Sequence, residues 1–299
     1  MGQPAAAPMV NVHVMEVWLG LSFQPTTEML ADARAAEEAG YAGVTVSDHL
    51  VWPGRIDSRY PYTDSGDVLW PPATEWPDAC VMAGAVLSVT STLRFATNVY
   101  LPTLRDPTVV AKAVSTAAVL SNDRIALGVG AGWMSEEFAA LDKPFAGRGA
   151  LLDDALETMR ELWSGGRVAR TEAQEAVDGI VMRPAPARPV PIWVGGHSPA
   201  AVRRAVRHDG WIGVLGRDVH ASASEARHLR HRRSESPAAE APFTIILTGY
   251  TDDLEVFAVL QDAGVDAIFL TPGRFSRRDG PDRHTAIHRY ADRVLSRLP

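Results

Sequence analysis

An Asp-His pair at the end of a short apolar segment is the first candidate for chemistry. Ser47, Asp48 and His49 follow directly on the run GVTV. Histidine titrates near neutral pH and can transfer protons, and a neighbouring carboxylate can orient the imidazole or raise its basicity. We therefore expect His49 to act as a catalytic acid or base, assisted by Asp48. The alternative is that Asp48 caps the next segment and that His49 only makes a local hydrogen bond.

The glycine-rich segment GVGAGW at 128–133 could bring a ligand close to the backbone. Glycine lacks a Cβ atom and adopts positive φ angles readily, which makes Gly130, Ala131 and Gly132 candidates for cofactor contacts. The spacing differs from the dinucleotide-binding fingerprint, because the third glycine is not at the required offset. A tight turn without a ligand is the alternative interpretation.

A second glycine-rich segment, Gly195-Gly196-His197-Ser198, precedes the helical stretch PAAVRRAVRH and could bind an anion. Ser198 is suited to cap that helix, and Pro199 to be its first residue. The N–H groups before the cap would lie at the positive end of the helix dipole, which favours a phosphate group. The alternative is a plain turn from strand to helix.

Short apolar segments alternate with amphipathic stretches, and these elements must position the candidate residues. The sequence predicts strands near 14–21, 43–47, 94–99, 124–129, 191–195, 211–214, 243–248 and 266–270, and helices at 26–39, 75–89, 107–119, 145–163, 199–207, 217–233, 251–263 and 283–297. Short strands without polar alternation are typical of a parallel sheet that is buried on both faces. Gly40, Gly210 and Gly264 each stand between a helix and a strand, where glycine suits the left-handed residue that ends a helix. The repeated joint favours a closed (β/α)8 TIM barrel over a doubly wound open sheet.

A barrel of this kind takes about 250 residues, so the 299 residues leave room for insertions. We place them at 50–74, 165–190 and 234–242, in a single domain over 1–299 with a flexible segment at 1–12. Segment 50–74 follows a strand, so we expect it on the C-terminal face of the barrel, where such enzymes carry their active sites. Its many aromatic residues predict a pocket wall or lid, and a subunit contact is the alternative.

Composition narrows the classes of partner. Lys and Arg total 29 against 36 Asp and Glu, a net charge of −7, which disfavours nucleic-acid binding because phosphate neutralisation needs a surplus of basic residues. The single cysteine, Cys80, excludes an internal disulfide, and the nine histidines lack metal-ligand spacing, so we expect no metal site. No apolar run is long enough to span a membrane, and the first ten residues do not resemble a signal peptide. We expect a cytoplasmic protein that binds a small molecule.

Taken together, four segments resemble the luciferase-like monooxygenase superfamily, and most closely its branch that uses the deazaflavin coenzyme F420. These are VTVSDHLVWP, RFATNVYLPTLRDPTVVAKAVSTAAVLSNDRIALGVGAGWMSEEF, FAGRGALLDDALETMRELW and PVPIWVGGHSPAAVRRAVRHDGW, in order over residues 15–215. The resemblance implies a (β/α)8 barrel with the coenzyme ring at the C-terminal mouth. It also implies a homodimer.

The resemblance assigns roles position by position. Asp48 and His49 match a pair beside the ring, with His49 exchanging a proton with the substrate. Asn98 and Val99 match the end of the third strand, where the family has a non-proline cis peptide bond. The resemblance places the loop Gly130-Ala131-Gly132 under the coenzyme ring. It places the segment Gly195-Gly196-His197, which precedes the predicted cap Ser198, around the coenzyme phosphate.

One departure bears on the substrate. The sugar-phosphate dehydrogenases of this branch carry a catalytic glutamate where this chain has Trp133, and Glu136 and Glu137 are expected to lie too far along the chain to replace it. A sugar-phosphate substrate is therefore disfavoured. We expect Trp133, Trp52 and Tyr100 to form an apolar aromatic substrate pocket instead, with plain packing of Trp133 as the alternative.

These observations predict an oxidoreductase that transfers a hydride between coenzyme F420 and a small organic substrate. The first alternative is an FMN-dependent monooxygenase that receives reduced flavin from a partner reductase. The second is a barrel that binds flavin or a metabolite without catalysis. An aldolase with a Schiff-base lysine is disfavoured, because Lys112 and Lys143 are the only lysines and neither lies on a predicted strand.

Overall fold

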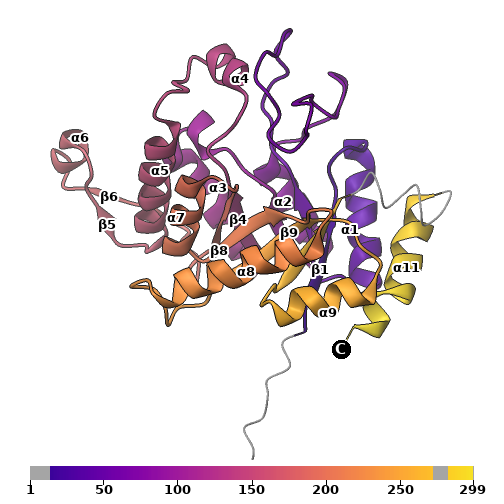
Figure 1. Cartoon of the computed structure of the whole chain (residues 1–299). Helices are drawn as coiled ribbons and strands as arrows, with labels where there is room; N and C mark the ends of the chain where they lie inside the picture. The colour runs from indigo at the N-terminus through magenta and orange to yellow at the C-terminus, as the bar shows by residue number, and fades with distance from the viewer. Residues whose placement is uncertain (1–13, 272–281, 299) are drawn as a thin grey trace, which may run out of the picture.

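In a computed structural model, which describes residues 14–271 and 282–298, eight parallel strands close into a barrel (Figure 1). In chain order the strands are β1 (Glu16–Gly20), β2 (Gly43–Val46), β3 (Arg94–Thr97), β4 (Ile125–Val129), β7 (Ile192–Gly195), β8 (Gly210–Val214), β9 (Thr244–Gly249) and β10 (Ala267–Leu270). β1 pairs with both β2 and β10, which closes the sheet. The predicted (β/α)8 barrel is confirmed, and the open-sheet alternative is wrong. The segment expected to be flexible, 1–12, lies outside the described residues.

Helices follow the strands and cover the outside of the barrel. They are α1 (Met29–Glu38), α2 (Ala79–Val89), α3 (Pro107–Leu120), α5 (Arg148–Trp163), α7 (Pro199–Arg207), α8 (Val219–Ser234), α9 (Leu254–Asp262) and α11 (Arg283–Arg293), with short 3-10 turns at Thr26–Glu28, Pro102–Leu104 and Leu295–Arg297. Several begin at a side chain that accepts backbone N–H groups of the first turn, as Asp78, Asp106 and Ser198 do. These caps fix where the chain leaves each loop of the C-terminal face.

The structure adds elements that the sequence pattern did not reveal. A one-and-a-half-turn helix, α4 (Ser135–Ala140), follows the glycine-rich end of β4. The predicted insertion at 165–190 contains a small hairpin of β5 (Arg167–Val168) and β6 (Ile180–Val181) with α6 (Glu172–Glu175) at its tip. This arm projects away from the barrel at the left of Figure 1.

Two of the three predicted glycine joints have the expected conformation. Gly40 and Gly264 end α1 and α9 with φ angles of 84° and 83°, in the left-handed region that favours glycine. Gly210 is instead the first residue of β8, so the prediction for this joint is wrong. Here α7 ends at His208, whose backbone is extended rather than left-handed. The carboxylate of Asp209 then accepts the N–H of Ile192, and this hydrogen bond ties the start of β8 to β7.

Aromatic rings fill the middle of the barrel. Trp18, Trp193 and Phe269 pack with ring centroids 5.3–6.1 Å apart. Glycines make room for the two indoles, because a Cβ atom on Gly43 would lie 2.3 Å from the Trp18 ring and one on Gly210 would lie 2.6 Å from Trp193. Space is therefore left only above this layer, towards the carboxyl ends of the strands.

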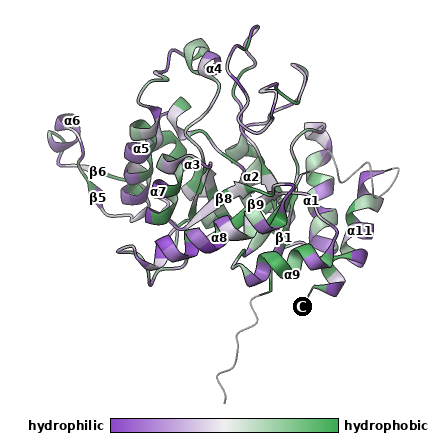
Figure 2. Ribbon diagram, viewed as in Figure 1, coloured by the Kyte–Doolittle hydropathy of each residue, from purple (hydrophilic) through white to green (hydrophobic). Residues whose placement is uncertain are grey.

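The second core lies between the strands and the surrounding helices. Helix α8 shows that a helix can join this core with little apolar surface, because most of its residues are hydrophilic (Figure 2). It buries Ala226 and Leu229 against the barrel, whereas Arg227, His228 and His231 are exposed. In the described part of the chain, every helix is too short or too polar to cross a lipid bilayer.

Candidate active site

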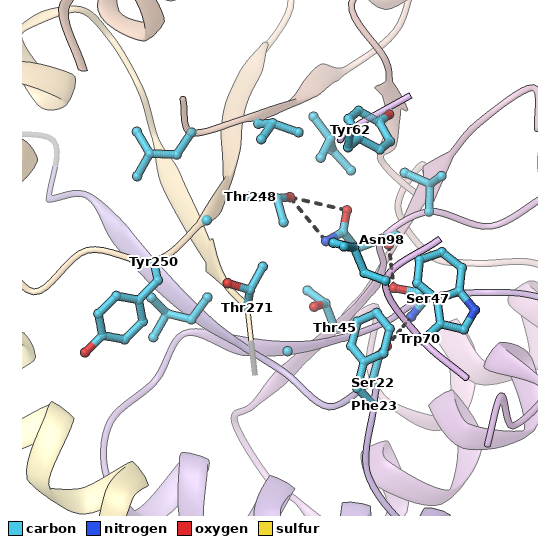
Figure 3. Close-up of a pocket in the computed structure, with 18 of the residues that line it drawn as sticks. Ser22, Phe23, Thr45, Ser47, Tyr62, Trp70, Asn98, Thr248, Tyr250 and Thr271 are labelled. Atoms are coloured by element: carbon cyan, nitrogen blue, oxygen red, sulfur yellow. Dashed lines mark hydrogen bonds between the residues drawn. The ribbon is translucent and has the colours of Figure 1, made fainter. Parts of the chain in front are cut away.

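A cavity of about 1160 Å³ opens at the carboxyl ends of the strands (Figure 3). Small polar side chains at the ends of several strands, or just after them, line its floor: Ser22, Thr45, Ser47, Asn98, Thr248 and Thr271. The Asn98 amide lies 3.2 Å from the Thr248 hydroxyl, and Ser47 donates a hydrogen bond of 2.8 Å to the Asn98 carbonyl. The floor is thus a preformed set of uncharged hydrogen-bonding groups at the place where barrel enzymes bind ligands.

Three of the predicted cofactor-binding residues line this cavity: Asn98, Val99 and Gly195. The peptide bond between Asn98 and Val99 is cis, as the family resemblance predicted. The Val99 side chain packs between Gly130 and Gly195, where added Cβ atoms would lie 2.7 and 2.8 Å from its methyl groups. Both glycines are therefore needed to seat Val99.

The segment Gly130-Ala131-Gly132 does not line the cavity in the described structure. Gly132 has a φ of 87°, and a Cβ atom on it would lie 2.6 Å from the Phe138 ring. Packing therefore accounts for glycine at 130 and 132 without a ligand, as in the tight-turn alternative. A contact of this loop with a cofactor stays a prediction.

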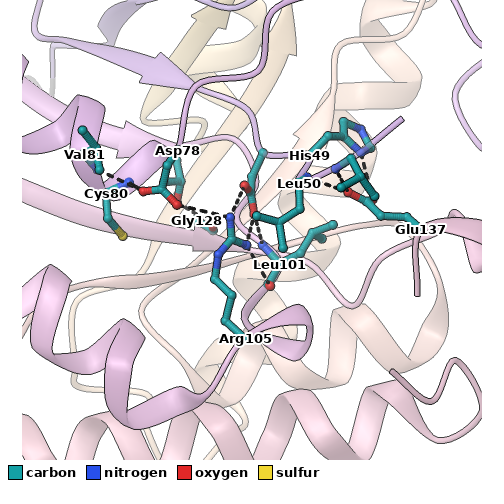
Figure 4. Close-up of polar contacts among 12 residues, drawn as sticks. His49, Leu50, Asp78, Cys80, Val81, Leu101, Arg105, Gly128 and Glu137 are labelled. Carbon is teal, nitrogen blue, oxygen red and sulfur yellow. Dashed lines mark hydrogen bonds and ion pairs between the residues drawn. The ribbon is translucent and has the colours of Figure 1, made fainter. Parts of the chain in front are cut away.

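The described partner of Asp48 is Arg105 and that of His49 is Glu137, so the expected pairing of Asp48 with His49 is wrong (Figure 4). The Asp48 carboxylate forms a bidentate ion pair with Arg105 at 2.7 and 2.8 Å and accepts the N–H of Leu101. Burial raises the pKa of Asp48 above its usual value, and the Arg105 guanidinium acts in the opposite direction. Asp48 thus fastens the end of β2 to the segment after β3.

Glu137 is the residue that holds His49, contrary to the expectation that it lies too far along the chain. Its carboxylate lies 3.0 Å from Nδ1 of His49 and accepts the N–H of Leu50 at 2.6 Å. The Glu137 side chain is fully buried, and that of His49 is 11% exposed. No described residue bonds Nε2 of His49, so this nitrogen remains available for proton transfer.

An aromatic cluster surrounds His49 and includes the predicted Trp133. The ring centroids of Trp76, Trp70 and Trp133 lie 5.0, 5.5 and 6.3 Å from that of His49. Trp70 also lines the cavity, whereas His49 does not. The indole of Trp70 is therefore the contact between the cavity and the imidazole.

The expectation that segment 50–74 forms a pocket wall is borne out by Tyr60, Tyr62 and Trp70, which all line the cavity.

The two other residues predicted for the substrate pocket lie elsewhere. Tyr100 is 2% exposed and packs in the outer core, with the Arg105 guanidinium 4.4 Å above its ring. Burial, together with the nearby Cys80, raises its pKa. Its assignment to the pocket is wrong, because the chain after Val99 turns this side chain outwards from the barrel. Trp52 does not line the cavity and makes none of the described ring contacts.

The predicted phosphate site is only partly free. Ser198 caps α7 as predicted, by accepting the N–H of Ala201. The His197 ring is held on both nitrogens, since Nδ1 lies 2.9 Å from Glu225 and Nε2 accepts the N–H of Val214. The Gly196 N–H donates to Ile212 within the barrel. Among the described acceptors, none receives the N–H of His197 or of Ser198, and these two groups remain for an anion.

The structure adds one basic residue that sequence reasoning missed. Arg217 is exposed and is the single cationic side chain among the described residues that line the cavity. It follows the end of β8 in the sequence GRD, one residue before the cap of α8. A basic residue in a loop directly after a barrel strand was the available signal.

Comparison with known proteins gives the family. The profile of the luciferase-like monooxygenases matches residues 9–253. Uncharacterized protein Rv0940c of Mycobacterium tuberculosis is 35% identical over 275 residues, which covers 89% of this chain and 94% of that protein. The F420-dependent hydroxymycolic acid dehydrogenase of the same organism is 33% identical over 199 residues, 65% of this chain and 50% of that protein.

A solved structure shares the fold at low sequence identity. An F420-dependent secondary alcohol dehydrogenase superposes with a TM-score of 0.68 and 15% identity, covering 95% of this chain and 99% of that one. The fold, the cavity at the carboxyl ends of the strands and the profile match agree with the family resemblance of the sequence. The chain belongs to the luciferase-like monooxygenase family.

Proposed function

We propose that the protein is an F420-dependent oxidoreductase that transfers a hydride between the deazaflavin and a small organic molecule. The observation that carries this proposal is the buried Glu137–His49 pair next to a large cavity with polar groups on its floor at the mouth of the barrel. Support for the coenzyme comes from the relatives, because two proteins similar to this chain are named as F420-dependent dehydrogenases. When bound, a deazaflavin supplies a carbon atom that gives or takes a hydride.

The residues present fit such a coenzyme. The cavity volume of about 1160 Å³ exceeds what a drug-sized ligand needs, which leaves room for a tricyclic ring and a substrate together. Its floor offers hydroxyl and amide groups, among them those of Thr248 and Asn98, to the polar edge of a ring. Gln24 also lines the cavity, and both polar atoms of its side-chain amide, Nε2 and Oε1, are buried without a described hydrogen-bond partner. An amide in this state is suited to bind a polar heterocycle.

His49 is the group that moves a proton in this proposal. The Glu137 carboxylate accepts a hydrogen bond from Nδ1–H, which leaves the lone pair of the neutral imidazole on Nε2. His49 therefore takes a proton from a substrate hydroxyl at Nε2 when an alcohol is oxidised, and returns one when a C=O, C=C or C=N bond is reduced. A positioned acid or base of this kind contributes about 10²–10⁴-fold to the rate.

Other residues hold this arrangement and exclude water. The Asp48–Arg105 ion pair fixes the start of the loop after β2, which carries His49. The indoles of Trp70, Trp76 and Trp133 cover the imidazole, which lowers the local dielectric and strengthens the contact with Glu137. We assign the anionic tail of the coenzyme to Arg217 and to the free N–H groups of His197 and Ser198.

We also propose that the protein forms a homodimer. Val81 at the start of α2 and Val109 at the start of α3 are 73% and 66% exposed, and the two helices pack side by side. Exposed apolar residues on adjacent helices indicate a surface that another protein covers. Light scattering on the purified protein distinguishes one copy from two, and the double substitution of both valines by glutamate should give monomers.

The experiment that tests the function compares coenzymes on the purified protein. We expect fluorescence titration to give tighter binding of F420 than of FMN, and His49→Ala to lower turnover about 10²–10⁴-fold with little change in F420 affinity. Tighter binding of FMN would favour the flavin-dependent monooxygenase instead. Tight F420 binding without hydride exchange to any alcohol, ketone, enone or imine would favour the non-catalytic binding barrel.

A further inference from the structure

The indole of Trp70 occupies a cage of aromatic rings. It is 7% exposed. Its ring centroid lies 5.1 Å from Tyr60, 5.5 Å from His49, 5.5 Å from Trp76, 5.7 Å from Phe23 and 6.4 Å from Trp133, mostly with edge-to-face geometry. Edge-to-face contacts at these distances are the arrangement in which aromatic rings attract each other. A flat apolar ring at this place is therefore stabilised on every side, whether or not it belongs to the protein.

Polar groups of the cage are left without partners. The Nε1–H groups of Trp70 and Trp76 are buried and bond to no described residue. Buried indole N–H groups normally find an acceptor, because a buried donor without a partner loses its hydrogen bond to water and gains none in return. Nε2 of His49 also has no described partner. The cage therefore holds a donor on Trp76 and an acceptor on His49 that Trp70 does not satisfy.

The segment that carries Trp70 is fastened to the barrel only at its ends. Ser58 bonds to Glu136 and Ser135, and Glu75 accepts the N–H of Thr26. Between these points, the described hydrogen bonds of residues 59–74 all stay within the segment, such as that from Tyr60 N to Gly66 O. Packing rather than hydrogen bonding holds segment 59–74 against the described part of the barrel, so the segment can lift without breaking a described hydrogen bond to the rest of the protein.

We propose that the place of the Trp70 indole is the substrate subsite. A flat aromatic substrate with one uncharged oxygen substituent takes this place when segment 59–74 lifts, and the oxygen meets Trp76 Nε1–H and His49 Nε2. The cage disfavours a charged substrate, because its rings are uncharged and the carboxylate of Glu137, which bonds the cage residue His49, is already bound to His49 and Leu50. This inference rests on the proposed function only in treating His49 as the group that exchanges the proton.

The test uses the full chain without coenzyme and 2-naphthol as the probe. Trp70→Ala empties the cage, and an apolar cavity of that kind binds aromatic molecules. We expect Trp70→Ala to bind 2-naphthol at least tenfold more tightly than the wild type, which must first displace its own indole. Trp52→Ala removes an indole from the same loop outside the cage and should leave the affinity unchanged within about twofold. In Trp70→Ala, 2-naphthol should also shift the imidazole resonances of His49 in NMR spectra.

The proposal is overturned if folded Trp70→Ala binds 2-naphthol no more tightly than the wild type, or if binding leaves the His49 resonances unmoved. Equal binding of glucose 6-phosphate would overturn the assignment of a neutral aromatic substrate. If Trp70→Ala does not fold, Trp70→Phe is the variant to test. Its smaller ring leaves part of the cage empty, so its affinity for 2-naphthol should be higher than that of the wild type. The assay contains no coenzyme, so failure of the cage and failure of the F420 assignment are observed separately.

Discussion

Glu137 and His49 are 88 positions apart in sequence and form a buried pair, with the carboxylate 3.0 Å from Nδ1 of the imidazole. Glu137 comes from the short helix α4 after β4, and His49 from the loop after β2. The same carboxylate accepts the Leu50 N–H. One side chain therefore sets both the ring orientation of His49 and the start of the loop that covers the cavity.

Glu137→Gln should impair proton transfer while the chain stays folded. The amide oxygen can still accept the Leu50 N–H, but its NH₂ group then faces Nδ1 and drives the imidazole to the opposite tautomer. We expect kcat to fall about 10²-fold, with KM little changed, and nitrogen NMR to show the proton moved to Nε2. Glu136→Gln is the matched control, because the described hydrogen bonds of the Glu136 side chain go to the loop at Asp57 and Ser58 and not to His49. Equal losses in the two variants would mean that Glu137 acts through loop structure alone.

Arg217→Gln should weaken coenzyme binding. A charge-assisted hydrogen bond to a phosphate contributes about 1.5–3 kcal/mol, so we expect F420 affinity to fall at least tenfold and its salt dependence to become shallower. Titrations at two salt concentrations measure both effects. Arg203→Gln removes the same charge from an exposed position on α7 that does not line the cavity and should change little. An unchanged affinity in Arg217→Gln would place the anionic tail elsewhere.

His208 should make the protein less stable in mild acid. Burial, followed by the nearby Arg160 charge, lowers the pKa of His208 to about 4. The unfolded chain protonates this residue below about pH 6.5, whereas the folded chain keeps it neutral. Stability is therefore complete above pH 6.5 and falls as the pH drops towards 4. Between pH 7 and pH 4, the melting temperature should fall less steeply in His208→Gln than in the wild type. His288→Gln is the control, because His288 lies on the exposed side of α11, and its melting temperatures should follow those of the wild type.

Gly43→Ala should destabilise the barrel. The added Cβ atom would lie 2.3 Å from the Trp18 ring and 2.7 Å from the carbonyl of Arg94, and neither can move freely in the packed interior. Overpacking of this kind costs about 1–3 kcal/mol or more, and thermal unfolding measures it. Gly54→Ala is the control, because nothing lies within 4 Å of its added Cβ atom. Equal melting temperatures for the two variants would contradict the tight fit of Trp18.

The sequence by itself determined the barrel and its strands. Runs such as GVTV and RFAT are short, apolar and separated by amphipathic stretches, and this local pattern is enough to identify strands that are buried on both faces. The caps of α2, α3 and α7 are also local, because each depends on a side chain two or three residues from the N–H group it accepts. The family motifs likewise predict a role for His49 and Asn98 and the cis peptide bond after Asn98, which the structure contains.

The tertiary structure alone decided the partners of those residues. Asp48 is next to His49 in the sequence, yet it pairs with Arg105, 57 positions away, and His49 pairs with Glu137. Neighbouring residues after a strand point in different directions, so adjacency along the chain does not bring their side chains together. Tyr100 turns outwards for the same reason, and Trp70 enters the cage only because the long loop folds back over the mouth of the barrel. Contacts between loops depend on how the closed sheet brings distant strand ends together, and no local pattern records that.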